Sequence, residues 1–198
     1  MPRLREELFR IRRGMILFVL LSFGVLAGCQ TTATTETPPD SLTTLILVRH
    51  AEKVSDGSDD PPLTEEGQQR AEMLSSWLGY TELTAIYSTP YQRTQATVAP
   101  TAIRHDLSVQ TYPPGGDKQT FLEDLTRQYA GQKVLICGHS NTIPPMLNLL
   151  LGAERYENLA DEAYDHVFIV TLRQPGHASV IDLQMDISRY PADTIDMN

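Results

Sequence analysis

The segment LILVRHAEK, residues 45–53, decides the fold that the sequence predicts. Its first four residues form a short continuous apolar run, which is typical of a strand buried on both faces of a sheet. The polar residues Arg49, His50, Glu52 and Lys53 follow at once. In open α/β sheets, ligands bind beyond the carboxyl ends of the strands. The segment therefore predicts a central strand with a polar site at its end.

Strand and helix patterns alternate through the rest of the chain. Apolar runs predict further strands at 85–87, 108–112 and 134–137, and helical patterns begin near Thr64, Pro90, Phe121 and Asn141. The last two strands, 167–172 and 180–185, are joined by the turn QPGH and predict a hairpin. The expected fold is α/β, a three-layer αβα sandwich whose sheet is mainly parallel with an antiparallel edge hairpin.

The composition describes a globular protein and excludes several classes. The chain has 198 residues, 41% of them hydrophobic, which is enough for one core. Its formal net charge of -9 argues against a nucleic-acid-binding protein, which needs a basic face. Two cysteines are too few for a disulfide scaffold. Cys137 lies in an apolar run, where we expect a buried small hydrophobe.

Residues 1–28 resemble a bacterial lipoprotein signal peptide. Five arginines precede an apolar run at 15–27, which is shorter than the roughly 20 residues that a membrane-spanning helix needs. The run ends in LAGC, which implies cleavage before Cys29 and lipidation of this residue, with palmitate among the expected acyl groups; an uncleaved membrane anchor is the alternative. The residue after Cys29 is Gln30 and not the aspartate that would alter lipoprotein sorting. In a Gram-negative cell envelope this implies attachment to the outer membrane, facing the periplasm. Residues 29–41 predict a flexible tether, and residues 42–198 a catalytic domain.

Two arginines and two histidines are expected to meet at one edge of the sheet. Arg49 and His50 follow the first predicted strand, Arg93 follows the second, and His139 follows the fourth. Two guanidinium groups can clamp a tetrahedral anion, and the helix N-terminus after Ser140 adds backbone donors. An imidazole among these cations is held toward its neutral form, which leaves a lone pair for attack on phosphorus.

Four motifs resemble, in order, the signature of the histidine phosphatase superfamily, which is phosphoglycerate mutase-like: RHAE at 49–52, LTEEGQ at 63–68, YSTP at 87–90 with Arg93–Thr94, and GHS at 138–140. The resemblance implies that His50 is the nucleophile of a phosphoric monoester hydrolase and forms a phosphohistidine. Arg49, Arg93 and His139 would then form the phosphate pocket. Ala51 stands where many members have glycine. The short spacing resembles the small RHAEK/RHG-type phosphatase branch, and no cofactor is implied.

The sequence leaves the general acid open. A leaving group is protonated by a carboxyl that carries a proton when the ester is bound. Glu52, two residues after the expected nucleophile, and Asp117, in the segment PPGGD, are equal candidates. Glu123 is expected to face solvent, and Asp165 beside His166 is a more distant choice.

Two other functions compete with the phosphatase. The segment GHSNT at 138–142 is similar to a nucleophile elbow, so Ser140 could serve a serine hydrolase with Asp165 and either His166 or His177. A non-catalytic lipoprotein that binds a phosphorylated ligand is the other. No metal is expected, because HAE at 50–52 lacks the cysteines of zinc deaminases and the acidic loop 54–62 lacks the EF-hand pattern.

The expected partners are a small phosphorylated substrate and, through Cys29, a membrane; nucleic acid is not expected. The sequence does not select the substrate or the oligomeric state. It also leaves open whether loop 54–62 acts as a lid.

Overall fold

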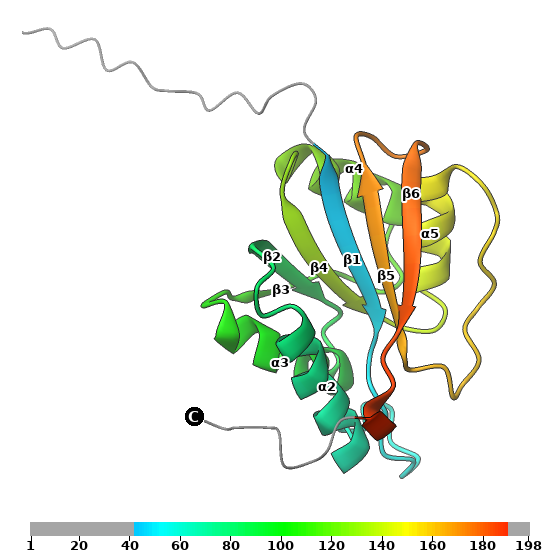
Figure 1. Ribbon diagram of the computed structural model, residues 1–198. Coiled ribbons are helices and arrows are strands. Elements are labelled where there is room, and N and C mark those ends of the chain that lie inside the picture. The colour runs from blue at the N-terminus through cyan, green and yellow to red at the C-terminus, as the bar shows by residue number, and fades with distance from the viewer. Residues whose placement is uncertain (1–41, 190–198) are drawn as a thin grey trace, which may run out of the picture. The chain divides into compact units, whose positions relative to one another are not determined.

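The structure is a computed structural model that describes residues 42–189. Strand β1 (Thr43–Arg49) pairs in parallel with β4 (Lys133–Gly138) and antiparallel with β5 (His166–Leu172). The six-stranded sheet has the order β3-β2-β4-β1-β5-β6 (Figure 1). Its other strands are β2 (Leu83–Ser88), β3 (Val109–Thr111) and β6 (Ala178–Gln184). Strands β2 and β3 are parallel to the centre, and β5 with β6 forms the antiparallel hairpin, so the predicted α/β fold is confirmed.

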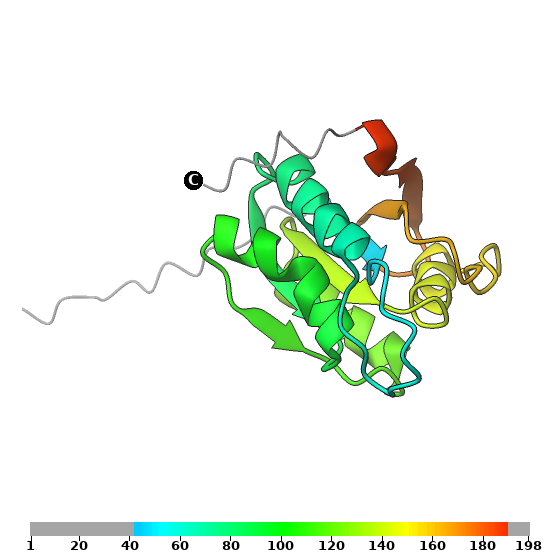
Figure 2. The same cartoon turned by 90° about the horizontal axis from the view of Figure 1, so that it is seen from below.

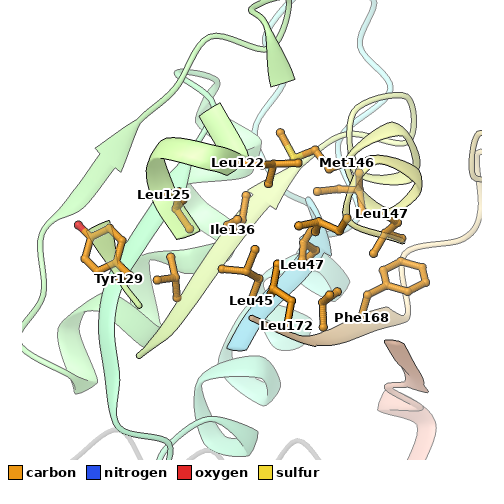
Figure 3. Packing of buried hydrophobic residues seen from close by; sticks show 14 of the residues in the cluster. Leu45, Leu47, Leu122, Leu125, Tyr129, Ile136, Met146, Leu147, Phe168 and Leu172 are labelled. Atoms are coloured by element: carbon orange, nitrogen blue, oxygen red, sulfur yellow. The ribbon is translucent and has the colours of Figure 1, made fainter. Parts of the chain in front are cut away.

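Alternate residues of the buried strands enter two separate cores. Leu45 and Leu47 of β1 point into the core beneath α4 (Lys118–Gln128) and α5 (Ile143–Leu151), which Figure 3 shows. Ile46 and Val48 point the other way, toward α2 (Glu65–Trp77) and α3 (Gln92–Arg104). Successive side chains of a strand face opposite sides, and each fully buried leucine or isoleucine contributes about 1.5–3 kcal/mol. The continuous apolar run therefore places β1 between two helical layers.

The four α-helices of the described residues lie in two pairs, one on each face of the sheet (Figure 2). Thr64 caps α2 as predicted, since its hydroxyl accepts a hydrogen bond from the Gly67 N–H at 3.1 Å. None of the described helices is long and apolar enough to cross a bilayer. The predicted signal peptide, at 1–28, and tether, at 29–41, lie outside the described residues.

Two helix starts differ from the prediction. Pro90 is not in the first turn of α3, because Tyr91 is extended and forms the N-cap, so that the helix begins at Gln92. The Asp60 carboxylate from a distant loop accepts the Gln92 N–H at 2.9 Å. Helix α5 begins at Ile143 rather than near 141, because the Thr142 hydroxyl accepts the His139 N–H and closes a turn first. Cys137 is a fully buried free thiol, as expected, and burial raises its pKa.

Glycine brings α2 close to the segment after β1. A Cβ at Gly67 would lie 2.2 Å from the Glu52 carbonyl oxygen, a distance that no side chain tolerates. The Thr64 N–H donates to that same oxygen at 2.9 Å. Helix α2 is thereby fixed against the residues that follow His50.

Candidate active site

Adjacent strands bring His50 and His139 together at the carboxyl edge of the sheet. Arg49 of β1 is paired in register with Gly138 of β4, and each histidine is the first residue after its strand. The His50 N–H donates to the Gly138 carbonyl at 2.9 Å, and the two ring centroids are 5.4 Å apart. The residues are only 3% and 9% exposed. The predicted meeting of the two histidines is thus a direct result of parallel register.

The His50 ring presents an unprotonated Nε2. Its Nδ1 lies 2.8 Å from the Ala51 carbonyl oxygen, which can only accept, so Nδ1 is assigned the proton. Burial, together with repulsion from Arg49, His139 and Arg93, lowers the pKa of His50 to about 3, although the hydrogen bond to Ala51 opposes the shift. The ring is therefore neutral near pH 7, and the Nε2 lone pair is available for attack on an electrophile.

A chain of hydroxyls assigns the tautomer of His139. The Thr94 hydroxyl has one proton and lies 2.9 Å and 2.8 Å from the carbonyl oxygens of Thr89 and Tyr91, which only accept. Thr94 must therefore accept from the Thr89 hydroxyl at 2.8 Å, and Thr89 in turn accepts from His139 Nε2–H at 2.9 Å. Burial, aided by Arg93, lowers the pKa of His139 to about 4. Nδ1 of His139 is left to take up a proton when an anion binds.

Arg49 is held by the segment between α5 and β5. Its Nη1 donates to the carbonyl oxygens of Ala160 at 2.7 Å and Ala163 at 3.3 Å, and its guanidinium lies 4.1 Å from the Tyr164 ring centroid. Desolvation lowers the pKa of this arginine, which remains a cation at neutral pH. The Nε–H is buried without a partner among the described residues. A buried donor of this kind is costly unless a ligand accepts from it.

Arg93 lies in the first turn of α3, and like Arg49 it is held by an aromatic ring and by a carbonyl oxygen. Its guanidinium lies 4.4 Å from the Tyr91 ring centroid, and Nη1 contacts the Asp59 carbonyl at 3.3 Å and the Asp60 carboxylate at 3.5 Å. Its Nε–H is also buried without a partner in the described part of the chain. The site therefore holds two cations that each keep an unused donor.

Two orphaned arginine donors beside two neutral histidines fit a tetrahedral dianion. Both arginines lower the pKa of each histidine by repulsion, so all four groups act on the same small volume. A bound dianion would satisfy the arginine donors and favour protonation of the histidines, which reverses the electrostatic cost of assembling them. Residues 42–189 contain no cluster of three or more histidine, cysteine or acidic side chains that could hold a metal ion.

Known proteins share this arrangement of elements. The family model of the histidine phosphatase superfamily (branch 1) matches residues 45–114, a segment that includes Arg49, His50 and Arg93. The match supports membership of that superfamily. No curated protein sequence matches the chain.

Several solved structures share the fold. The chain is similar to SixA from Nakamurella multipartitia, with 24% identity, a TM-score of 0.58, and coverage of 74% of this chain and 98% of that one. It is similar to the protein histidine phosphatase SixA complexed with tungstate (21% identity, TM-score 0.60, coverage 71% and 96%). A third similar structure is phosphoserine phosphatase from Entamoeba histolytica, with 20% identity, a TM-score of 0.57, and coverage of 73% of this chain and 98% of that one.

The structure does not favour Glu52 as a general acid. Both carboxylate oxygens of Glu52 accept from Arg70 Nε, at 2.9 Å and 3.0 Å. Arg70 also donates from Nη1 to the Met185 carbonyl at 2.8 Å. The glutamate therefore ties α2 to the segment after β1 and to the chain after β6. Sequence reasoning missed this partner because Arg70 looks like an ordinary polar residue of an amphipathic helix.

Asp117 is also placed in a structural role. Its carboxylate caps α4, accepting the backbone N–H groups of Gln119 at 3.0 Å and Thr120 at 3.3 Å. Hydrogen bonds from Thr120 lower its pKa, whereas a general acid needs a raised one. Glu123 accepts from the Gln119 amide, and Asp165 lies 3.8 Å from His166. Among the described residues, no carboxylate hydrogen-bonds to His50 or His139.

Ser140 and the aromatic residues complete the site's surroundings. Ser140 is half-buried and lies before α5, and the Thr142 and Ile143 N–H groups are used by the His139 carbonyl, both at 3.1 Å, rather than free for an anion. Tyr164, whose ring centroid is 5.9 Å from that of His50, was not predicted. No sequence pattern links it to the motifs, since only the fold returns this late segment to β1.

Proposed function

We propose that the protein is a phosphomonoesterase that acts through a phosphohistidine on His50. The observation that carries the proposal is a buried neutral imidazole with a free Nε2, set beside two arginines whose Nε–H donors are buried and unpartnered. These features match what phosphoryl transfer needs: a nucleophile, and positive groups for the equatorial oxygens.

The reaction takes place in two displacements. Nε2 of His50 attacks phosphorus and forms an N–P bond, while the P–O bond to the leaving group breaks and its electron pair stays on that oxygen. Arg49 and Arg93 hold the non-bridging oxygens, and His139, whose Nδ1 takes up a proton from solvent when the dianion binds, donates a further hydrogen bond. Water then attacks phosphorus, the N–P bond breaks, and inorganic phosphate with a neutral His50 results.

The comparisons support a phosphatase at the level of the superfamily. The matched family model spans the nucleophile and both arginines, and the similar structures are described as phosphatases of protein histidine and of phosphoserine. The substrate of this chain is not assigned by them.

The test is hydrolysis of phenyl phosphate by the wild-type protein and by His50→Ala and Ser140→Ala, with His177→Ala as a control in the exposed hairpin turn. We expect His50→Ala to lose turnover and the other two variants to keep it. Brief incubation with ³²P-labelled substrate should leave acid-labile label on the wild-type protein and none on His50→Ala. Full turnover in His50→Ala would refute the mechanism, and binding without turnover by the wild type would favour a phospho-ligand-binding protein.

The serine hydrolase has less support. A nucleophile elbow is a sharp, strained turn, but among described non-glycine residues only Asp106 has a positive φ. His166, one proposed base, hydrogen-bonds to Asp182 at 2.9 Å rather than to Ser140.

Export and lipid attachment at Cys29 complete the proposed function. The support is the basic segment, the apolar run at 15–27 and the LAGC sequence at its end. A phosphatase placed there would act on phosphorylated molecules in the cell envelope.

A further inference from the structure

Two tyrosines stand at the ends of a row of four rings. The ring centroids of Tyr164 and His50 are 5.9 Å apart, those of His50 and His139 are 5.4 Å apart, and those of His139 and Tyr91 are 5.1 Å apart. The histidines in the middle are buried, whereas both tyrosines are half-buried. The two ends of the row, which solvent reaches, are thus aromatic.

Each tyrosine also covers one of the two arginines. Tyr164 lies over Arg49 and Tyr91 over Arg93, with guanidinium-to-centroid distances of 4.1 Å and 4.4 Å. Neither phenol hydroxyl has a hydrogen-bond partner within residues 42–189. The position of each tyrosine is therefore explained by its ring and not by its hydroxyl. A phosphate held by both guanidinium groups would therefore carry its ester group out between, or against, aromatic surfaces.

The carboxylates around the site limit which ester groups can leave. Glu52 is bound to Arg70, and Asp60 is bound to the Gln92 N–H and to Arg93. Asp161 and Glu162, which also act on Arg49, are exposed to solvent, and no carboxylate in the described part of the chain hydrogen-bonds to His50 or His139. Protonation of the departing oxygen is therefore left to solvent. An oxygen that leaves as an anion must be a weak base, and phenols, with a pKa of about 10, meet this need far better than aliphatic alcohols.

We propose that Tyr91 and Tyr164 form the leaving-group subsite of this enzyme and that its substrates are aryl phosphate monoesters. The proposal rests on the phosphohistidine chemistry proposed above. The aryl ring packs against a tyrosine ring while the phosphate lies between the arginines. When the His50 N–P bond forms and the P–O bond breaks, the electron pair leaves on the aryl oxygen as a phenolate, which takes its proton from water.

The experiment must separate aromatic contact from leaving-group acidity. It uses the full-length protein in detergent and three substrates: phenyl phosphate, hexafluoroisopropyl phosphate, whose fluorinated alcohol has acidity similar to phenol, and benzyl phosphate, which has a ring but a poor leaving group. The variants are Tyr91→Leu and Tyr164→Leu, with the matched phenylalanine variants. Tyr80→Leu is the control, because Tyr80 is fully exposed in the turn after α2.

We expect the wild-type kcat/KM to be highest for phenyl phosphate and lowest for benzyl phosphate. The ratio of phenyl to hexafluoroisopropyl kcat/KM should fall about 2- to 10-fold in each leucine variant, the range that one aromatic contact contributes, and stay near wild type in the phenylalanine and Tyr80→Leu variants. The inhibition constant of inorganic phosphate reports the phosphate pocket without an ester group, and it should change less than the ratio.

Three outcomes would contradict the proposal, and each identifies a different part of it as wrong. If the ratio is unchanged in both leucine variants while phosphate inhibition weakens, the tyrosines only hold the arginines, and the subsite is refuted. If the wild type hydrolyses benzyl phosphate as well as phenyl phosphate, the substrate class is wrong while the phosphatase stands. If it hydrolyses none and His50 takes no ³²P label, the proposed function fails together with the subsite.

Discussion

Acid should unfold this protein through its own active-site histidines. His50 is neutral in the native state, where burial lowers its pKa to about 3, but it takes up a proton in the unfolded chain near its ordinary value of 6.5. Between these two values the unfolded state binds more protons than the native state, so the free energy of unfolding falls as the pH falls. His139 acts with the same sign between 6.5 and about 4.

The magnitude follows from the linkage of protonation to unfolding. Each pH unit below 6.5 costs about 1.4 kcal/mol for a histidine that cannot protonate in the native state. Lowering the pH from 7.5 to 5 should therefore cost about 2 kcal/mol through His50, which is 3% exposed and so little screened by solvent.

The assay is urea unfolding of the full-length protein in detergent at pH 7.5 and pH 5. We expect His50→Asn, whose amide can still donate to the Ala51 carbonyl, to lose about 2 kcal/mol less than the wild type over this range. His177→Asn, in the exposed hairpin turn, should behave as the wild type does. Equal losses in wild type and His50→Asn would refute the neutral, buried histidine.

Tungstate gives the complementary test. This tetrahedral dianion should bind the two arginines and raise the pKa values of both histidines, so the stability it adds should increase as the pH falls from 7.5 to 5. Stabilisation by tungstate that does not depend on pH would contradict the arrangement of charges around His50.

Further variants test the roles that the structure gives to other residues. Glu52→Gln should lower the free energy of unfolding by about 3 kcal/mol, since it leaves the buried charge of Arg70 without a carboxylate. A kcat that falls about a hundredfold in folded protein would instead make Glu52 the acid. Asp117→Asn should keep kcat near wild type, as measured with phenyl phosphate, because the side chain only caps α4. Gly67→Ala should lower the melting temperature markedly, since its Cβ would lie 2.2 Å from a carbonyl oxygen. Cys29→Ser should abolish incorporation of labelled palmitate and release the protein from membranes; labelling that persists would disprove lipidation there.

The fold and the main site groups were predictable because both depend on short local patterns. A four-residue apolar run specifies a strand buried on both faces, and parallel strands end at the same edge, so His50 and His139 were expected to meet. The helix starts were less predictable. Pro90 suits a first helical turn by itself, but Tyr91 is extended and caps α3, and the Asp60 carboxylate accepts the N–H of Gln92, 32 residues later in the sequence.

The sequence by itself determined the order of strands and helices, the polar residues at the strand ends, and the chemistry that two arginines and two histidines can perform. Only the tertiary structure decided that neither candidate acid is free to protonate a leaving group. Both are carboxylates by sequence, but Glu52 is bound by Arg70 and Asp117 by the first turn of α4. The tertiary structure likewise decided that Tyr164 stands over Arg49, through a loop that returns to β1 from a distant part of the chain. A residue's type fixes what it can do, but its partners come from packing, and packing joins segments that the sequence keeps apart.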